Sequence, residues 1–391
     1  MAYRKFKADN LFDGYEFLPA DKVLITDEEG IVEGIVPVQE AGGDIQELSG
    51  ILSPGLINCH CHLELSHMKG YIPEGTGLVK FVLQVVQQRH FPEEEILQAI
   101  EKAEAEMLAN GIVAVGDICN NTLTIPQKVK GRINYHNFIE ASGFNPLIAP
   151  QRFEQSLGYF REYERNYSLP VAPKAIGDNS IVPHAPYSVS DELWDLVIHF
   201  PGNHLLTIHN QETEGENEWF IQKQGAVEEL YKEMNIDVTH FTASGKSSLQ
   251  TYLPKFQHNQ SVILVHNVYT SEEDILFAKN SGKQLYWCLC PNANQYITGQ
   301  FPDINLLINQ NCEIILGTDS LASNHQLSIL EEMRTIQKNF PLIETATMLK
   351  WATSNGAKAL QMDSLLGSFK TGKKPGIVFL SPSFDKSERI L

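Results

Sequence analysis

Short apolar runs alternate along the chain with segments of helical period. The runs at 262–265 and 314–316 are apolar at every position, which is typical of parallel strands that are buried on both faces. Helix-like segments separate the runs, among them Glu93–Asn110 and Ser328–Gln337. The eight runs are Gly50–His62, Ile112–Ile118, Ile133–Ile139, Ser180–His184, His204–His209, Ser261–His266, Gln284–Leu289 and Glu313–Asp319. Eight such strand-and-helix units predict an α/β fold of the (β/α)₈ TIM-barrel type.

The two ends of the chain differ from this middle part. Residues 1–52 hold short strand-like runs between turn residues, for example Lys22–Thr26 and Ile31–Val36. One more apolar run, Gly376–Ser381, follows a turn-rich stretch near the C-terminus. We therefore expect a small β-rich domain formed by both chain termini, residues 1–52 plus 365–391, and a barrel domain at residues 53–364.

The charge balance narrows the range of functions. The 391 residues carry 30 Lys+Arg against 48 Asp+Glu, which gives a net charge of −18. An acidic chain without basic stripes is poorly suited to bind nucleic-acid phosphates or anionic lipid headgroups. No run approaches the roughly 18 to 20 apolar residues of a membrane span, and no apolar signal segment follows the charged N-terminal residues. Six cysteines are too few for a disulfide scaffold, so we expect reduced thiols and a cytoplasmic protein.

Titratable side chains close five of the eight runs. The first run ends in His60 and His62, and later runs end in His184, His209, His266 and Asp319. In a barrel of this type the carboxyl ends of the strands meet at one rim, where the chemistry of such folds is found. The coincidence of these residues at strand ends therefore predicts a functional site more strongly than any one of them does.

The first strand brings two imidazoles to one face. Because side chains alternate along a strand, His60 and His62 point to the same side, and Cys59 and Cys61 point to the other. Two imidazoles at a barrel mouth can chelate one divalent cation. A structural zinc site made by Cys59 and Cys61 with Cys288 and Cys290 is the alternative, although pairs spaced C-x-C lack the usual knuckle spacing.

Glu212 follows His209 by three residues. If the strand end turns into a helix, both side chains share a face, and the carboxyl group lies beside a metal ligand in the position that a proton shuttle needs. We interpret the neighbouring acidic residues, Glu214, Glu216 and Glu218, as a solvated loop or the start of a helix.

Three further residues each have a structural alternative. Asp319 ends the last strand, where a carboxylate can bind a metal and accept a proton from its water, but it can also be an N-cap. His266 is either a site residue or a buried core histidine. His67 lies just past the first strand and is ambiguous.

These motifs resemble the amidohydrolase superfamily, in particular its aromatic-amine deaminases and triazine chlorohydrolases. The segments that carry the resemblance are Ser53–His62, His184–Ser190, His209–Thr213, Val265–Asn267, Cys290–Asn294 and Gly317–Asn324. The resemblance spans the whole chain and implies a TIM barrel with a small β-sandwich domain built from both termini. Asn58 stands where the superfamily commonly has Asp, and the late stretch at 372–376 also departs from its pattern, outside the site.

Position by position, the resemblance implies that His60, His62, His209 and Asp319 bind one metal ion, Zn²⁺ before Fe²⁺. Glu212 and His266 would be catalytic together with Asp319, and His184 would face the substrate. Members with two metals usually bridge them with a carboxylated Lys that closes the fourth strand, and the run at 179–184 offers no Lys. One metal is therefore expected.

The function implied is hydrolytic deamination of an amino-substituted heterocycle, a purine or nucleoside, with release of ammonia. Glu212 would protonate the ring nitrogen beside the attacked carbon, His266 would orient the water, and Asp319 would take its remaining proton. The loop at 62–67 most resembles deaminases of aminodeoxyfutalosine. A chlorohydrolase or a cyclic-amide hydrolase on the same metal site stays open as an alternative. A non-catalytic scaffold is disfavoured because all ligand positions are filled. Because relatives are commonly homodimers, a homodimer is also expected.

Overall fold

A computed structural model describes residues 3–167 and 178–391. Residues 1–2 of the expected terminal domain and residues 168–177 of the expected barrel domain lie outside this part. Within it the strands form three sheets. The first parallel sheet contains β6 (Leu56–Cys61), β7 (Ile112–Cys119), β8 (Asn134–Ala141) and β9 (Asn179–Pro183). The second contains β10 (Leu205–Asn210), β11 (Ser261–His266), β12 (Gln284–Leu289) and β13 (Ile314–Leu316).

These eight strands match the eight predicted runs, and every pairing within the two sheets is parallel. The sheets meet at two seams. At one seam the backbone N–H groups of Thr318 and Asp319 donate to the His60 carbonyl at 3.0 and 3.1 Å, and at the other the N–H of His209 donates to the His184 carbonyl at 3.1 Å. The pairing ladders of the described residues stop at both seams, so the structure establishes a parallel α/β fold without a continuously closed eight-stranded barrel.

The first predicted strand, Gly50–His62, is wrong as a single element. It divides into β5 (Ile45–Pro54), which pairs with terminal strands, and β6, which enters the first parallel sheet. Gly55 joins them at a close approach, since a Cβ atom there would lie 2.3 Å from Cγ1 of Val113. The chain can pass from one sheet to the other only because this position has no side chain.

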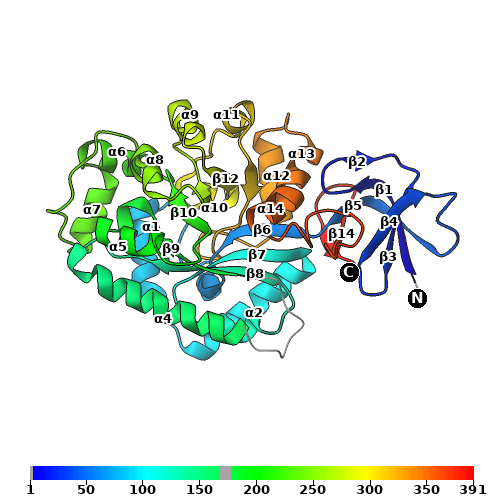
Figure 1. Cartoon of the computed structure of the whole chain (residues 1–391), viewed down its shortest axis with the longest axis horizontal. Coiled ribbons are helices and arrows are strands. Elements are labelled where there is room, and N and C mark those ends of the chain that lie inside the picture. Colours follow the sequence, from blue (N-terminus) through cyan, green and yellow to red (C-terminus); the bar gives the residue numbers. More distant parts are fainter. Residues whose placement is uncertain (1–2, 168–177) are drawn as a thin grey trace.

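The third sheet combines strands from both ends of the chain. It has seven strands in the order β15-β14-β5-β1-β3-β4, with β2 paired to β1. Their bounds are β1 (Tyr3–Phe12), β2 (Phe17–Leu18), β3 (Lys22–Asp27), β4 (Val32–Pro37), β14 (Ile377–Leu380) and β15 (Ser387–Arg389). Figure 1 shows this sheet at one end of the molecule, with both termini beside it.

Helices follow the strands of the two parallel sheets and cover them (Figure 1). The longer ones are α1 (Leu78–Gln88), α2 (Glu93–Ala109), α4 (Ala149–Tyr167), α5 (Asp191–Ile198), α6 (Glu214–Gln222), α7 (Ala226–Glu233), α9 (Glu272–Asn280), α10 (Pro291–Thr298) and α12 (Ile329–Asn339). The shorter ones are α3 (Ile125–Lys128), α8 (Ser248–Tyr252), α11 (Ile304–Asn309), α13 (Thr345–Lys350) and α14 (Gly356–Ala359). No helix of the described part is long and apolar enough to cross a membrane.

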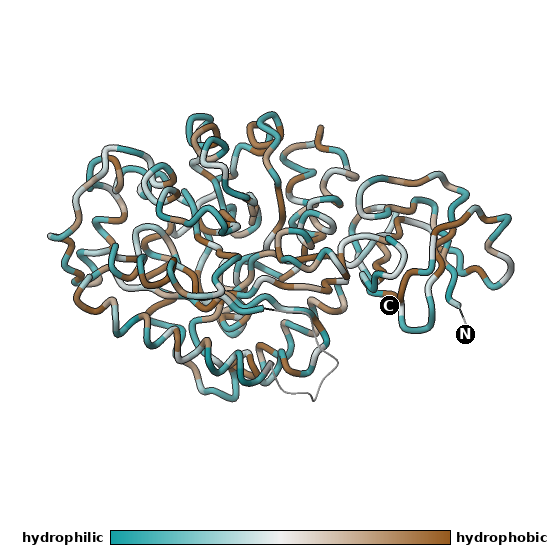
Figure 2. Tube along the Cα trace, viewed as in Figure 1, coloured by the Kyte–Doolittle hydropathy of each residue, from teal (hydrophilic) through white to brown (hydrophobic). Residues whose placement is uncertain are grey.

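The main core lies between these helices and the two sheets. On α2 the buried side chains Ile96, Ile100 and Met107 recur at helical spacing and pack toward it. Figure 2 shows the same alternation of hydrophobic and hydrophilic positions along the helices. Each fully buried aliphatic side chain contributes about 1.5 to 3 kcal/mol, so the packing of one helix face holds the strand ends in place.

A buried ion pair fixes the backbone just after β6. Lys128 and Asp117, both fully buried, form a salt bridge. The second oxygen of Asp117 accepts the backbone N–H of Leu63 at 2.8 Å. Because Leu63 directly follows His62, this carboxylate sets the direction in which the chain leaves β6.

Candidate active site

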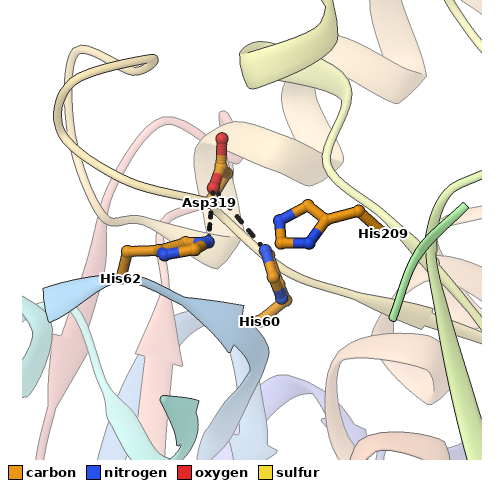
Figure 3. A group of neighbouring side chains, drawn as sticks. All are labelled: His60, His62, His209 and Asp319. Atoms are coloured by element: carbon orange, nitrogen blue, oxygen red, sulfur yellow. Dashed lines mark ion pairs between the residues drawn. The ribbon is translucent and has the colours of Figure 1, made fainter. Parts of the chain in front are cut away.

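Four of the predicted ligands converge at the carboxyl ends of the strands. His60 and His62 come from β6 and the residue after it, His209 from β10, and Asp319 from the loop after β13. Their ligand atoms all lie within 4.8 Å of one another, and all four residues are buried. Figure 3 shows the three imidazoles and the carboxylate pointing toward a common centre.

The chemistry of this set fits a divalent cation. An Asp319 carboxylate oxygen lies 3.6 Å from Nε2 of His60 and 3.3 Å from Nε2 of His62 (Figure 3). Both ring nitrogens of His60 are buried without a hydrogen-bond partner in the described part of the chain. A buried imidazole without partners is costly, whereas three imidazoles and one carboxylate are a common ligand set for zinc or iron.

Burial and neighbouring charges keep the four groups in the forms that bind metals. Burial lowers the pKa of His62 and, together with the neighbouring imidazoles, lowers that of His209 further, so both rings are neutral. Burial acts to raise the pKa of Asp319, but the imidazoles of His60, His62 and His266 beside it hold that pKa well below its usual range. Metal ligands must be deprotonated, and this site meets that condition at neutral pH.

The orientation of His209 is set by a backbone group. Its Nδ1 donates to the carbonyl of His184 at 2.7 Å, which leaves Nε2 as the nitrogen that can bind a metal. A ligating imidazole usually donates its other N–H in this way.

Glu212 lies between β10 and α6 and is 5% exposed. Burial, with the charges of Asp319 and Glu216 adding to it, raises the pKa of Glu212 well above its ordinary value. Its carboxyl group lies 3.7 Å from Nε2 of His266, and the raised pKa favours its protonated form. This is the form that a general acid needs.

His266 lies beside the cluster and is oriented by an amide. The side-chain NH₂ group of Asn294 donates to Nδ1 of His266 at 3.0 Å, so the ring proton is on Nε2. Burial lowers the pKa of His266 to about 3, which keeps the ring neutral, and its Nε2 lies 3.7 Å from a carboxyl oxygen of Glu212. The alternative of an isolated core histidine is therefore not what the structure shows.

Four residues at these strand ends have left-handed backbone conformations. The φ angles of Gln211, His266, Asn267 and Asp319 are 46°, 76°, 61° and 57°. Non-glycine residues adopt this region at a cost, and they do so mainly where surrounding contacts impose it. For Asp319 one such contact comes from Asn58, whose amide group binds both the backbone N–H and the hydroxyl of the preceding residue, Thr318.

The cluster lies at the base of a cavity of about 380 Å³. His62, His184, His209, Glu212, His266 and Asp319 line it together with apolar side chains of α1 and α7. Its polar wall contains Glu64, Asn120 and Glu140, and two arginines, Arg89 and Arg152, also line it. A cavity of this size fits a small organic molecule.

Sequence reasoning missed Glu140 and Asn294. His184 Nδ1 is 2.6 Å from Oε1 of Glu140. Burial acts to raise the pKa of Glu140, yet His184 lowers it to about 2, and the same pair raises the pKa of His184. Glu140 directly follows the predicted run Ile133–Ile139, so extending that run by one residue reveals another titratable strand end.

The structure also bears on the alternative zinc site of four cysteines and on the role of His67. Cys59, Cys61, Cys288 and Cys290 are buried free thiols, and the ligand clusters found in the described residues contain no cysteine. His67 hydrogen-bonds the carbonyls of Glu64 and Arg89, and so it supports the loop after β6.

The prediction that Glu216 is solvated is wrong. This carboxyl group is fully buried, and its Oε1 accepts the backbone N–H of Gln211 at 3.0 Å. The helix start was predicted correctly, since α6 begins at Glu214. Glu216 shares a helix face with Trp219 and Phe220, which are also buried. It therefore holds the turn that precedes Glu212.

A pH-dependent stability follows from Glu216. Burial raises its pKa to about 7, from an ordinary value of 4.5. Between these two values the folded chain holds a proton that the unfolded chain releases, so the stability present at low pH is lost as the pH rises through about 7. This change in pH lowers the free energy of unfolding by about 3 kcal/mol. We expect Glu216→Gln to lack this pH-dependent decrease, because Gln does not titrate. Urea unfolding of both proteins at pH 5 and pH 8, with equal metal loading, measures it; equal pH dependence in the two would contradict a protonated Glu216.

Three kinds of comparison with known proteins each match most of the chain. A model of the Amidohydrolase family matches residues 51–390. The adenosine deaminase of Helicobacter pylori (strain ATCC 700392 / 26695) is 28% identical over 398 residues, which cover 96% of this chain and 93% of that protein. The 5-methylthioadenosine/S-adenosylhomocysteine deaminase of Teredinibacter turnerae is 27% identical over 341 residues, covering 84% and 71%. The crystal structure of Helicobacter pylori aminofutalosine deaminase in complex with methylthio-coformycin superposes with a TM-score of 0.81 at 25% identity, covering 97% and 92%.

Proposed function

This chain belongs to the amidohydrolase family, and from that premise we propose that it is a metal-dependent hydrolase that releases ammonia from an amino-substituted heterocycle of the nucleoside type. The observation that carries the proposal is the cluster of three imidazoles and one carboxylate with a buried carboxyl group, Glu212, beside it, whose pKa burial raises. A metal ligand set next to a general acid is what hydrolysis of an aromatic C–N bond requires.

In this proposal His60, His62, His209 and Asp319 hold one divalent cation, with zinc before iron. The chemistry that such a cation supplies when bound is a water whose pKa falls from 15.7 toward about 7. The assignment of these ligands is supported by the unpartnered ring nitrogens of His60 and by the neutral state of His62 and His209.

The protein groups around the cation then divide the proton transfers among them. Glu212 donates its proton to the ring nitrogen next to the attacked carbon, so that no negative charge builds up on the ring. His266 donates a hydrogen bond from Nε2 and orients the attacking water. One proton of that water replaces the proton that Glu212 gives up. Asp319 takes the other and passes it to the departing amine, so that the amine and one water become ammonia and a ring carbonyl.

The substrate class rests on the cavity and on the relatives. Ring-sized ligands fit a cavity of about 380 Å³ that is apolar on one side and polar on the other. The two Helicobacter pylori relatives carry the names adenosine deaminase and aminofutalosine deaminase, and we propose a 6-aminopurine nucleoside, with aminodeoxyfutalosine as the first candidate.

The remaining expectations stand as part of the same proposal. We assign residues 1–52 plus 365–391 to a β-sandwich domain and residues 53–364 to a metal-dependent TIM-barrel hydrolase domain. Six free cysteines suit the reducing cytoplasm. Homodimerisation is an expectation from the resemblance.

Ammonia release is the direct test. Zinc- or iron-loaded protein should release ammonia from at least one member of a panel containing aminodeoxyfutalosine, adenosine, 5-methylthioadenosine, S-adenosylhomocysteine, guanine and cytosine. Assays for chloride release from chlorotriazines and for ring opening of cyclic amides run in parallel. Activity in one of these, with no ammonia from the panel, would contradict the deaminase assignment and favour the corresponding hydrolase.

A further inference from the structure

Glu140 has no place in the proposed chemistry, yet it is among the most constrained side chains near the cavity. It lies near the end of β8 and is 6% exposed, and β7 separates this strand from β6, which carries the first proposed ligands. Its two carboxylate oxygens have different partners. Oε1 lies 2.6 Å from Nδ1 of His184, and Oε2 accepts a hydrogen bond from the side-chain amide of Asn120 at 2.7 Å.

The contact with His184 settles which way the imidazole faces. A carboxylate can only accept, so the short contact at Oε1 requires a proton on Nδ1 of His184. Nε2 is then the ring atom left for the cavity, which His184 lines. The side chain of His184 is 30% exposed, whereas that of Glu140 is 3% exposed. The carboxylate therefore lies behind the ring, on the side away from solvent.

His184 is also connected to the metal cluster through its backbone. Its carbonyl oxygen accepts Nδ1 of His209 at 2.7 Å and the backbone N–H of His209 at 3.1 Å. The side chain of His184 contacts the ring of His209, with ring centroids 4.5 Å apart. A change in the position of His184 therefore alters its contacts both with a molecule in the cavity and with His209, a proposed ligand of the cluster.

We propose that Glu140 is a positioning residue that holds the ring of His184, through Nδ1, with Nε2 directed at the substrate. This inference rests on the proposed function, in which His184 is the residue that faces the substrate. Asn120 supports the same geometry, since its amide occupies the second carboxylate oxygen and leaves the first for His184.

Glu140, His184 and His209 also each offer one ligand atom, and these atoms all lie within 4.8 Å of one another, close enough to hold a metal ion. The hydrogen bonds disfavour that alternative. The 2.6 Å separation between Nδ1 of His184 and Oε1 of Glu140 is the length of a direct hydrogen bond. Nδ1 of His209 already donates its proton to the His184 carbonyl, so it is not free to bind a metal. We therefore expect one equivalent of metal per chain, and a second equivalent that is lost in Glu140→Gln would overturn the positioning role.

The kinetic test is a double-mutant cycle. A Gln side chain can accept at only one of the two atoms where Glu140 accepts, so Glu140→Gln loses either the His184 or the Asn120 contact. We expect a 10- to 100-fold fall in kcat/KM for the best substrate at unchanged metal content, as is usual when the support of a functional imidazole is removed. In a His184→Ala background the same substitution should change kcat/KM by less than about twofold, because partners in one network are not additive. Equal losses in both backgrounds would show that Glu140 acts on something other than His184.

A spectroscopic test does not need the substrate. In zinc-loaded protein with ¹⁵N-labelled histidine, the His184 signals, assigned by their absence in His184→Ala, should show a proton on Nδ1. That proton signal should be lost or weakened in Glu140→Gln and in Glu140→Ala, the second variant being unable to accept any hydrogen bond. An unprotonated Nδ1 in the parent protein, or an unchanged signal in both variants, would overturn the proposal. If ammonia release fails for every substrate while Nδ1 is protonated as expected, the proposed function fails and the positioning role stands.

Discussion

Glu212→Gln is expected to lower kcat for deamination by about a thousandfold while leaving metal content unchanged. A positioned general acid contributes roughly 10² to 10⁴ in rate, and an amide of almost the same shape cannot give up a proton. Burial raises the pKa of this carboxyl group and so favours its protonated form, and Glu212 is not part of the four-residue ligand cluster. Steady-state ammonia release together with metal analysis by mass spectrometry measures both quantities.

Glu214→Gln is the matched control for this variant. Glu214 is an exposed carboxyl group two residues away, at the start of α6. Its replacement should leave kcat within about twofold, since exposed substitutions of this kind rarely matter. If Glu212→Gln keeps near-normal turnover, Glu212 is not the proton donor. If it loses metal as well as activity, its role is in metal binding.

His60→Ala is expected to lose both metal and activity. His60 is fully buried, and its ring nitrogens have no other partner in the described residues. Removing a direct ligand should weaken metal binding by at least the 10- to 100-fold that loss of a supporting partner costs. A ligand at a thousand times its Kd stabilises the folded state by about 4.1 kcal/mol, so zinc should raise the Tm of the parent protein and have little effect on the variant.

The comparison for His60→Ala is His199→Ala, which removes an exposed histidine after α5. This control should retain metal, activity and the increase in Tm. Full metal occupancy in His60→Ala after dialysis would contradict the ligand assignment, and an unchanged Tm response to zinc would do so independently of any substrate.

The candidate site could largely be predicted from the sequence because its residues end local elements. The alternation of side chains along a strand is a local property, and it correctly brought His60 and His62 to one face. The same local argument missed Glu140, because the predicted run at 133–139 ended one residue too early. Asn294 belongs to a motif that the sequence displayed, but its contact with His266 depends on the packing of α10 against another strand end.

The errors have physical causes of the same kind. In the run at 50–62 apolar residues lie on both sides of Pro54 and Gly55, so its pattern predicts one strand, although the chain leaves one sheet and enters another at Gly55. The burial of Glu216 was predictable from its helical spacing to Trp219 and Phe220, but the acidic residues around it favoured a solvated loop. The walls of the cavity come from α1 and α7, which are distant in sequence, and no local pattern indicates that they meet.

The seam between β6 and the end of β13 has a consequence for how the protein is made. Asn58 and Thr318 are 260 positions apart and bind each other there. At the usual speed of synthesis the ribosome needs on the order of tens of seconds to make the chain between them. During that time His60 and His62 have left the ribosome without the carboxylate of Asp319. A nascent or prematurely ended chain therefore lacks a complete ligand set. Only a chain that has been synthesised beyond Asp319 has all four ligands and can bind the metal fully.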